Sequence, residues 1–174
     1  NLKSAGLLNP RAILRCPEEQ LYNALKPSGY FRVKTQRLRA FCDYLVERHR
    51  GDIASMAKRD TAELRKELLH VHGIGEETAD DILLYACDKP IFVVDAYTRR
   101  ILHRHGICSA KIDYGELQRI FHQNLPVDLT MFKEYHGLIV YTGKDFCRKT
   151  PRCDQCPLKP LLPKDNPPPR DELS

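Results

Sequence analysis

The chain has 174 residues, of which 42% are hydrophobic, and a formal net charge of +5 at pH 7. This length and composition are enough for one or two small domains with a buried core. No apolar run approaches the ~20 residues that span a bilayer, and no secretory signal is evident, so we expect a cytoplasmic protein with no membrane partner. The seven cysteines have no evident disulfide spacing and fit a reducing compartment, where thiols pack as small hydrophobes or bind metal.

Apolar periodicity and capping signals predict an all-α fold. The predicted helices span residues 17–25, 31–49, 60–69, 76–87, 95–105, 113–123 and 128–143. In the second of these helices Leu38, Cys42 and Leu45 recur at helical spacing, and Gly51 is a natural stop. Asp60 followed by Glu63 is a capping box for the third helix. The polar, proline-rich segment 159–174 is expected to be a flexible tail.

The sequence Gly73-Ile74-Gly75 joins the helices predicted at 60–69 and 76–87. Glycines at such a turn leave backbone amides exposed with no Cβ in the way, so a phosphate can approach the main chain closely. The hairpin therefore predicts a contact with the DNA backbone, although a Gly-Ile-Gly sequence alone is a weak signal.

Asp95 follows the apolar run Ile91–Val94 and precedes a predicted helix. A carboxylate anchored in this way in a water-poor site can stabilise positive charge that develops in a transition state, or can activate an attacking water. Asp95 is therefore a candidate catalyst. The alternative role is that of a helix N-cap, which is compatible with catalysis.

The chain resembles the helix-hairpin-helix DNA glycosylases of the endonuclease III superfamily in its motif residues Leu69, Gly73-Ile74-Gly75, Thr78-Ala79 and Val94-Asp95. The similarity runs from about Asn9 to Leu158. It implies a two-lobed fold with a DNA cleft between the lobes, in which a helical barrel lobe at 1–93 contains the helix-hairpin-helix at about 60–87. The second helical lobe spans 94–158. In this family a further stretch precedes the position of Asn1, so we expect an N-terminal truncation that removes some base-pocket residues.

The resemblance also implies roles for individual residues. Asp95 is expected to be catalytic and Tyr97 to line the base pocket. The equally weighted alternative for Tyr97 is an ordinary helix residue that packs at a domain seam. DNA contacts are expected from Gly73, Ile74, Gly75 and Thr78. A monovalent cation that bridges to a phosphate is expected on the carbonyls of Leu69, Val71 and Ile74.

Glu77 stands where bifunctional members of the family carry a lysine that attacks the sugar as a Schiff-base nucleophile. A carboxylate cannot form an imine, so abasic-site lyase activity is not expected. The surrounding sequence is similar to the branch of endonuclease III-type 3-methyladenine DNA glycosylases. An N-alkylated purine is cationic and leaves as a neutral base, so one carboxylate is sufficient. The alternative interpretation of Glu77 is a solvated helix acid.

A cysteine loop at 147–156 carries Cys147, Cys153 and Cys156 and resembles the iron–sulfur loop of the same family. The family's loop has four cysteines, and Leu161-Leu162 occupy the place of the fourth. Three interpretations follow: a [4Fe-4S] cluster with an incomplete cysteine set, which is the leading one, a zinc ion, or a loop without metal.

The predicted function is that of a monomeric, monofunctional DNA glycosylase in base excision repair. It would bind double-stranded DNA containing a damaged base, flip out an N-alkylated purine such as 3-methyladenine, and hydrolyse its N-glycosidic bond. Two alternatives remain: a bifunctional or mismatch-specific glycosylase of the same superfamily, and a non-catalytic helix-hairpin-helix DNA-binding module.

Overall fold

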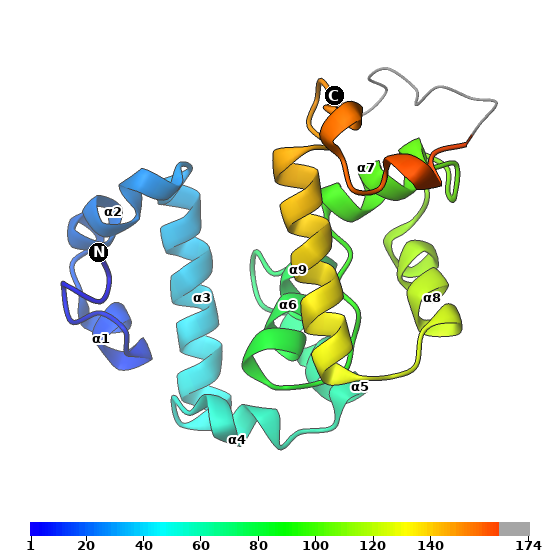
Figure 1. Ribbon diagram of the computed structural model, residues 1–174. Helices are drawn as coiled ribbons and strands as arrows, with labels where there is room; N and C mark the ends of the chain where they lie inside the picture. Colours follow the sequence, from blue (N-terminus) through cyan, green and yellow to red (C-terminus); the bar gives the residue numbers. More distant parts are fainter. Residues whose placement is uncertain (164–174) are drawn as a thin grey trace. The chain divides into compact units, whose positions relative to one another are not determined.

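The computed structural model describes residues 1–163 of the chain (Figure 1). These residues form helices and helical turns and contain no strand, which confirms the predicted all-α class. The chain divides into two compact units, Asn1–Lys89 and Pro90–Ser174. No helix in the described part is long and apolar enough to cross a membrane. The tail predicted at 159–174 lies mostly outside the described residues, although Lys159–Leu161 form a short 3-10 helix within them.

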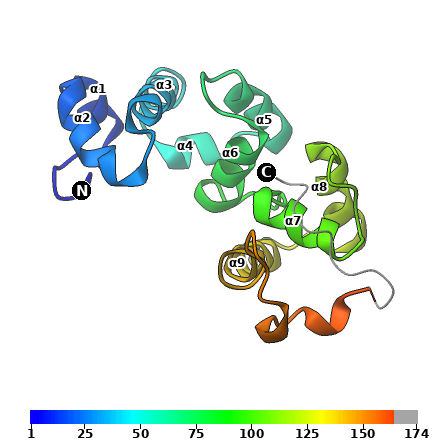
Figure 2. The same cartoon turned by 90° about the horizontal axis from the view of Figure 1, so that it is seen from above.

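The first unit contains α1 (Pro10–Arg15), α2 (Glu18–Leu25), η1 (Lys26–Ser28), α3 (Phe31–His49), α4 (Ile53–Ala57), α5 (Thr61–Leu69), α6 (Glu76–Asp81) and η2 (Ile82–Ala86). Helices α1 and α2 pack against α3, as both views show (Figures 1 and 2). The core beneath them includes Leu7, Ile13, Leu21 and Cys42. Helix α3 ends where predicted, just before a left-handed pair with φ of +59° at Arg50 and +81° at Gly51.

Helices α1 and α4 were not predicted from the sequence. They have six and five residues, which is too short for apolar periodicity to be visible. Both begin at a capping side chain: Asn9 accepts the first amides of α1, and Asp52 accepts those of α4. The sequence signals for these two helices are therefore limited to their starts, namely the two caps and Pro10 at the first position of α1.

The two hairpin helices, α5 and α6, differ in how well they were predicted. Asp60 caps α5 as expected, because its side chain accepts the amides of Ala62 and Glu63. The reciprocal half of the predicted capping box does not form, since the carboxylate of Glu63 accepts from Nζ of Lys66 at 3.4 Å. The segment predicted as a single helix at 76–87 is helical as far as Ala86 but is not α-helical throughout: α6 ends at Asp81, and the chain continues as the π-helical turn η2. The wider turn shifts the register, so Leu84 is fully buried.

A buried ion pair joins the two hairpin helices. The guanidinium of Arg65 donates from Nε to Oδ1 of Asp80 at 2.7 Å and from Nη2 to Oδ2 at 3.1 Å. The side chain of Asp80 is completely buried. This bidentate pair fixes α5 against α6 and so holds the hairpin turn between them.

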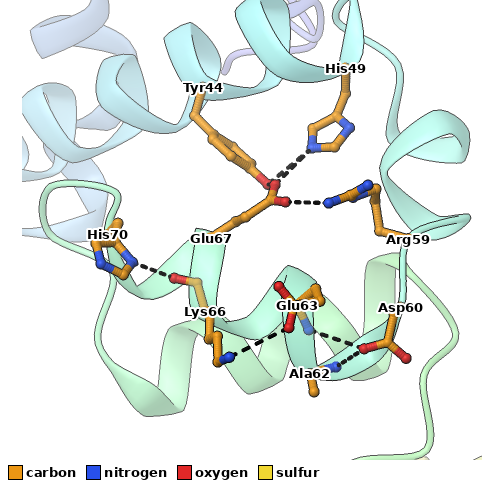
Figure 3. A network of polar contacts seen from close by, with 9 residues as sticks. All are labelled: Tyr44, His49, Arg59, Asp60, Ala62, Glu63, Lys66, Glu67 and His70. Atoms are coloured by element: carbon orange, nitrogen blue, oxygen red, sulfur yellow. Dashed lines mark hydrogen bonds and ion pairs between the residues drawn. The ribbon is translucent and has the colours of Figure 1, made fainter.

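A second polar network ties α5 to α3 (Figure 3). Glu67 of α5 accepts from the Tyr44 hydroxyl at 2.9 Å and from Arg59 Nη2 at 2.7 Å, while Nε2 of the buried His49 lies 2.9 Å from the same hydroxyl. Burial and the bond to Glu67 raise the pKa of Tyr44, so the hydroxyl remains a donor. The network fixes the first hairpin helix relative to the long helix α3.

The second unit contains α7 (Ala96–Arg104), α8 (Tyr114–Asn124), α9 (Leu129–Asp145), η3 (Cys153–Gln155) and η4 (Lys159–Leu161). Helix α7 packs against α9. The core between the extended segment before α7 and helices α8 and α9 is aromatic: Phe92 stacks on Phe121 with a centroid distance of 3.8 Å and meets Phe132 edge to face at 5.4 Å.

Candidate functional site

The segment that carries Asp95 is anchored by both its side chains and its backbone. Phe92, Val93 and Val94 are almost completely buried, as the apolar run predicted. Two side chains of α8 satisfy the buried backbone of Phe92: the amide donates to His122 Nε2 at 3.1 Å, and the carbonyl accepts from Gln118 Nε2 at 2.7 Å. Asp95 therefore directly follows an extended segment that is held in place by buried side chains and by backbone hydrogen bonds.

Asp95 is the N-cap of α7. Its Oδ1 accepts from the amide of Thr98 at 2.7 Å and from the Thr98 hydroxyl at 2.8 Å. Its Oδ2 lies 3.8 Å from Nε2 of His136 on α9, which is too long for a hydrogen bond but within the range of electrostatic attraction. The side chains of Asp95 and His136 are only 11% and 9% exposed.

The surroundings of Asp95 keep its carboxylate ionised. Burial alone raises the pKa of Asp95, but His136 and the two bonds from Thr98 together outweigh that effect and place the pKa below its ordinary value. The result is a negative charge held in a mostly buried position. Such a group can stabilise a developing cation without first reorganising solvent.

Tyr97 is the second residue of α7, and its ring packs against α9. The Cγ atom of Tyr97 is 2.7 Å from the position that a Cβ on Gly143 would occupy, so this glycine makes room for the ring. The guanidinium of Arg100 lies 5.1 Å from the ring centroid. Tyr97 is thus a half-buried residue at the contact between α7 and α9.

The hairpin residues lie where the sequence predicted, at the turn between α5 and α6. Ile74 is buried and anchors the turn, whereas Gly75, Glu77 and Thr78 are exposed. Gly73 has a φ of +82°, which favours glycine, but Gly75 has an extended backbone and open space where a Cβ would be. Folding therefore does not require glycine at position 75, whereas the close approach of a ligand backbone would.

The three cysteines of the loop come together and line one cavity with Arg104. The buried guanidinium of Arg104 donates to Sγ of Cys147 at 3.3 Å and to the carbonyls of Arg148 and Lys149 at 2.6 and 3.1 Å. Burial raises the pKa of the Cys153 thiol, and the neighbouring Cys147 raises it further. The loop is thus held to α7 by an arginine.

The arrangement of this loop does not fit a metal cluster as it stands. The cavity has a volume of about 20 Å³, which is room for roughly one water molecule. Among residues 1–163, no group of three or more histidine, cysteine, aspartate or glutamate side chains is arranged to hold a metal ion. A cluster would require the loop to rearrange.

Sequence reasoning missed two partners of the predicted residues. His136 had the signal of a core histidine, because Phe132 and Ile139 flank it at helical spacing, and it is indeed buried. Its proximity to Asp95 depends on the packing of α9 on α7, which has no local signal. Arg104 lies in the last turn of α7, where basic residues are common, so its position gives no local signal of a contact with the cysteine loop.

Comparisons of the sequence with protein families and with individual proteins point to the same family. Residues 1–127 match the family described as HhH-GPD superfamily base excision DNA repair protein. A protein of Methanocaldococcus jannaschii, provisionally named a DNA repair glycosylase, is 47% identical over 161 residues, which cover 91% of this chain and 73% of that protein. Endonuclease III of Bacillus subtilis is 28% identical over 87% of this chain and spans beyond it, since the match covers 65% of its length.

A solved structure supports the same fold. The crystal structure of the Helicobacter pylori 3-methyladenine DNA glycosylase bound to 1,N6-ethenoadenine has a TM-score of 0.71 and 28% sequence identity to this chain. The match covers 82% of this chain and 73% of that one.

Proposed function

Because the chain belongs to the HhH-GPD superfamily of base excision DNA repair proteins, we propose that it is a monofunctional DNA glycosylase acting on a damaged base in duplex DNA. The observation that carries this proposal is the ionised, mostly buried carboxylate of Asp95, held by Thr98 and faced by His136. A module that only binds DNA has no need of such a group.

The proposed chemistry uses one carboxylate. The damaged nucleotide leaves the base stack, and its C1′–N bond breaks with the electron pair passing to the departing base. The sugar then carries oxocarbenium-like positive charge, which Asp95 stabilises. Water adds at C1′ and loses one proton to bulk water, so the products are the free base and an abasic site.

We propose an N-alkylated purine such as 3-methyladenine as the substrate class. A cationic purine departs as a neutral base, so the reaction needs no acid partner for the leaving group. Glu77, exposed on the first turn of α6, offers no amine for the Schiff-base route. The similarity to an H. pylori 3-methyladenine DNA glycosylase also supports this class. The relatives named endonuclease III keep a bifunctional or mismatch-specific enzyme as the alternative.

The proposed partner is double-stranded DNA, bound by a monomer in the cytoplasm. The hairpin supports this partner: the amides of Gly73 and Gly75 donate to no other described residue, and the space at Gly75 is open. We assign the backbone contacts to this turn together with Thr78. A monovalent cation on the carbonyls of Leu69, Val71 and Ile74 belongs to the same proposal.

The cofactor proposal is a [4Fe-4S] cluster on Cys147, Cys153 and Cys156, with zinc or no metal as alternatives. Its support is the gathering of the three thiols around one cavity. One observation opposes it: the sulfur of Cys147 already accepts a hydrogen bond from Arg104, and this bond would have to break for Cys147 to bind iron. No step of the proposed reaction uses this group.

The decisive experiment measures base release by the full-length gene product from duplexes that each carry one lesion. Release of 3-methyladenine but not of oxidised pyrimidines or mismatched thymine is expected. Release of oxidised pyrimidines with strand cleavage would favour the bifunctional alternative. Binding to every duplex without release of any base would favour the non-catalytic module.

A further inference from the structure

Arg37 of α3 lies against the hairpin turn. Its Cγ and Cδ atoms fill the space that a Cβ on Gly73 would need, and its Nε lies 3.0 Å from that Cβ position. The aliphatic part of the side chain therefore covers the Cα of Gly73. This contact places a guanidinium beside the turn, although helices α4 and α5 lie between α3 and the turn in the sequence.

The guanidinium of Arg37 has no polar partner among the described residues. The residue is exposed, and no hydrogen bond or ion pair joins it to another described residue. Two other arginines of this unit differ in this respect: Arg65 pairs with Asp80, and Arg59 with Glu67. Arg37 therefore keeps its five N–H donors for a group outside the described chain.

The nearby backbone has donors of the same kind. The amides of Gly73 and Gly75 donate to no other described residue, and a Cβ at Gly75 would meet nothing within 4 Å. An arginine and two backbone amides on one turn offer donors and positive charge. A phosphate, with several acceptor oxygens and negative charge, complements such a set.

We infer that Arg37 is a DNA-phosphate-binding residue that extends the hairpin, its stem packed on Gly73 and its guanidinium directed to the backbone of the bound strand. This inference rests on the proposed function, since it takes DNA as the partner. It also gives Gly73 a second role besides its positive φ: a side chain there would displace Arg37.

The test uses three variants and the salt dependence of binding. Arg37→Met keeps an unbranched stem over Gly73 and removes the charge, while Arg37→Lys restores a charge. Arg48→Met removes an exposed charge near the other end of the same helix and is the matched control. The dissociation constant for abasic-site duplex is measured for each protein between about 0.05 and 0.2 M salt.

The expected result is specific to a phosphate contact. Arg37→Met should lower the slope of log K against log salt by about 0.9 and weaken binding about five-fold, whereas Arg48→Met should leave both near wild type. Arg37→Lys should recover most of the slope.

Two results would overturn the inference: an Arg37→Met slope equal to that of wild type, or an Arg37→Lys slope as low as that of Arg37→Met. Melting curves of the variants separate loss of folding from loss of a contact, because a purely structural role would change stability without changing the slope. If the wild-type protein bound DNA but released no base, the proposed function would fail. The salt slopes would still decide the role of Arg37.

Discussion

Replacing Asp95 by asparagine removes a charge while keeping the local structure. The amide oxygen of asparagine can accept the same two bonds from Thr98 that Oδ1 of Asp95 accepts at 2.7 and 2.8 Å. Asparagine and aspartate are about equal as N-caps, so the free energy of unfolding should change by less than about 1 kcal/mol. The substitution therefore tests the charge of Asp95 and not the cap.

The expected effect on catalysis is much larger. Removing one preorganised electrostatic group from an active site costs about 2.7–4 kcal/mol in the transition state, which is about 10²- to 10³-fold in rate. Asp95 is well suited to such an effect because its side chain is 11% exposed and little water can screen it. We expect base release by Asp95→Asn to fall at least ~100-fold, with binding to abasic-site DNA within a few-fold of wild type.

Single-turnover release of the damaged base is the appropriate assay, with a matched control at another N-cap. Asp128 caps α9 by accepting the amide of Met131 at 2.7 Å, and Asp128→Asn should leave excision unchanged. If Asp95→Asn kept more than about a tenth of wild-type excision, the loss would be under ~1.4 kcal/mol and the catalytic assignment would be wrong.

Four further expectations follow from the structure. Gly75→Ala should leave the melting temperature nearly unchanged and weaken DNA binding, whereas Gly73→Ala, at a φ of +82°, should destabilise the fold by about 1 kcal/mol or more in thermal unfolding. We propose that Glu77 replaces the Schiff-base lysine of bifunctional glycosylases, so borohydride added during turnover should trap no protein–DNA adduct on a denaturing gel. If the cysteine loop binds a cluster, purified protein should be brown and absorb near about 400 nm, and Cys153→Ser should lower iron content and melting temperature together; a colourless, metal-free protein would refute the cofactor proposal. Burial lowers the pKa of His49, so the free energy of unfolding should fall as pH drops below about 6.5, where the unfolded chain takes up a proton first, and His49→Gln should flatten that dependence in denaturant titrations.

The parts of the fold that the sequence predicted are those fixed by local signals. Helix α3 matches its predicted bounds because nineteen residues contain several repeats of the apolar period. Helix α5 follows from the cap at Asp60, and the anchoring of Asp95 follows from the apolar run before it. The break at Asp81 was not predicted, because the residues on either side of it suit a continuous helix and the π turn depends on packing.

The parts of the site that could not be predicted are contacts between residues far apart in the chain. Arg104 and Cys147 are 43 residues apart, and no pattern of spacing distinguishes an arginine that donates to a thiol from one that is solvated. The case of Arg37 is similar, because the glycine at position 73 is explained from sequence by the turn alone. In both contacts the motif residue, Cys147 or Gly73, was identified from the sequence, whereas its arginine partner is brought to it only by tertiary packing.

The two glycines of the hairpin turn are required for different reasons. Glycine at 73 and glycine at 75 look equivalent in a motif, yet the first is required by a positive φ and by the side chain of Arg37, while the second is required by neither conformation nor packing. A position where folding leaves glycine optional, next to unpaired amides and an uncommitted guanidinium, is where an external ligand best explains the residue. The hairpin's functional signal therefore lies at Gly75 and Arg37, and the structural signal lies at Gly73.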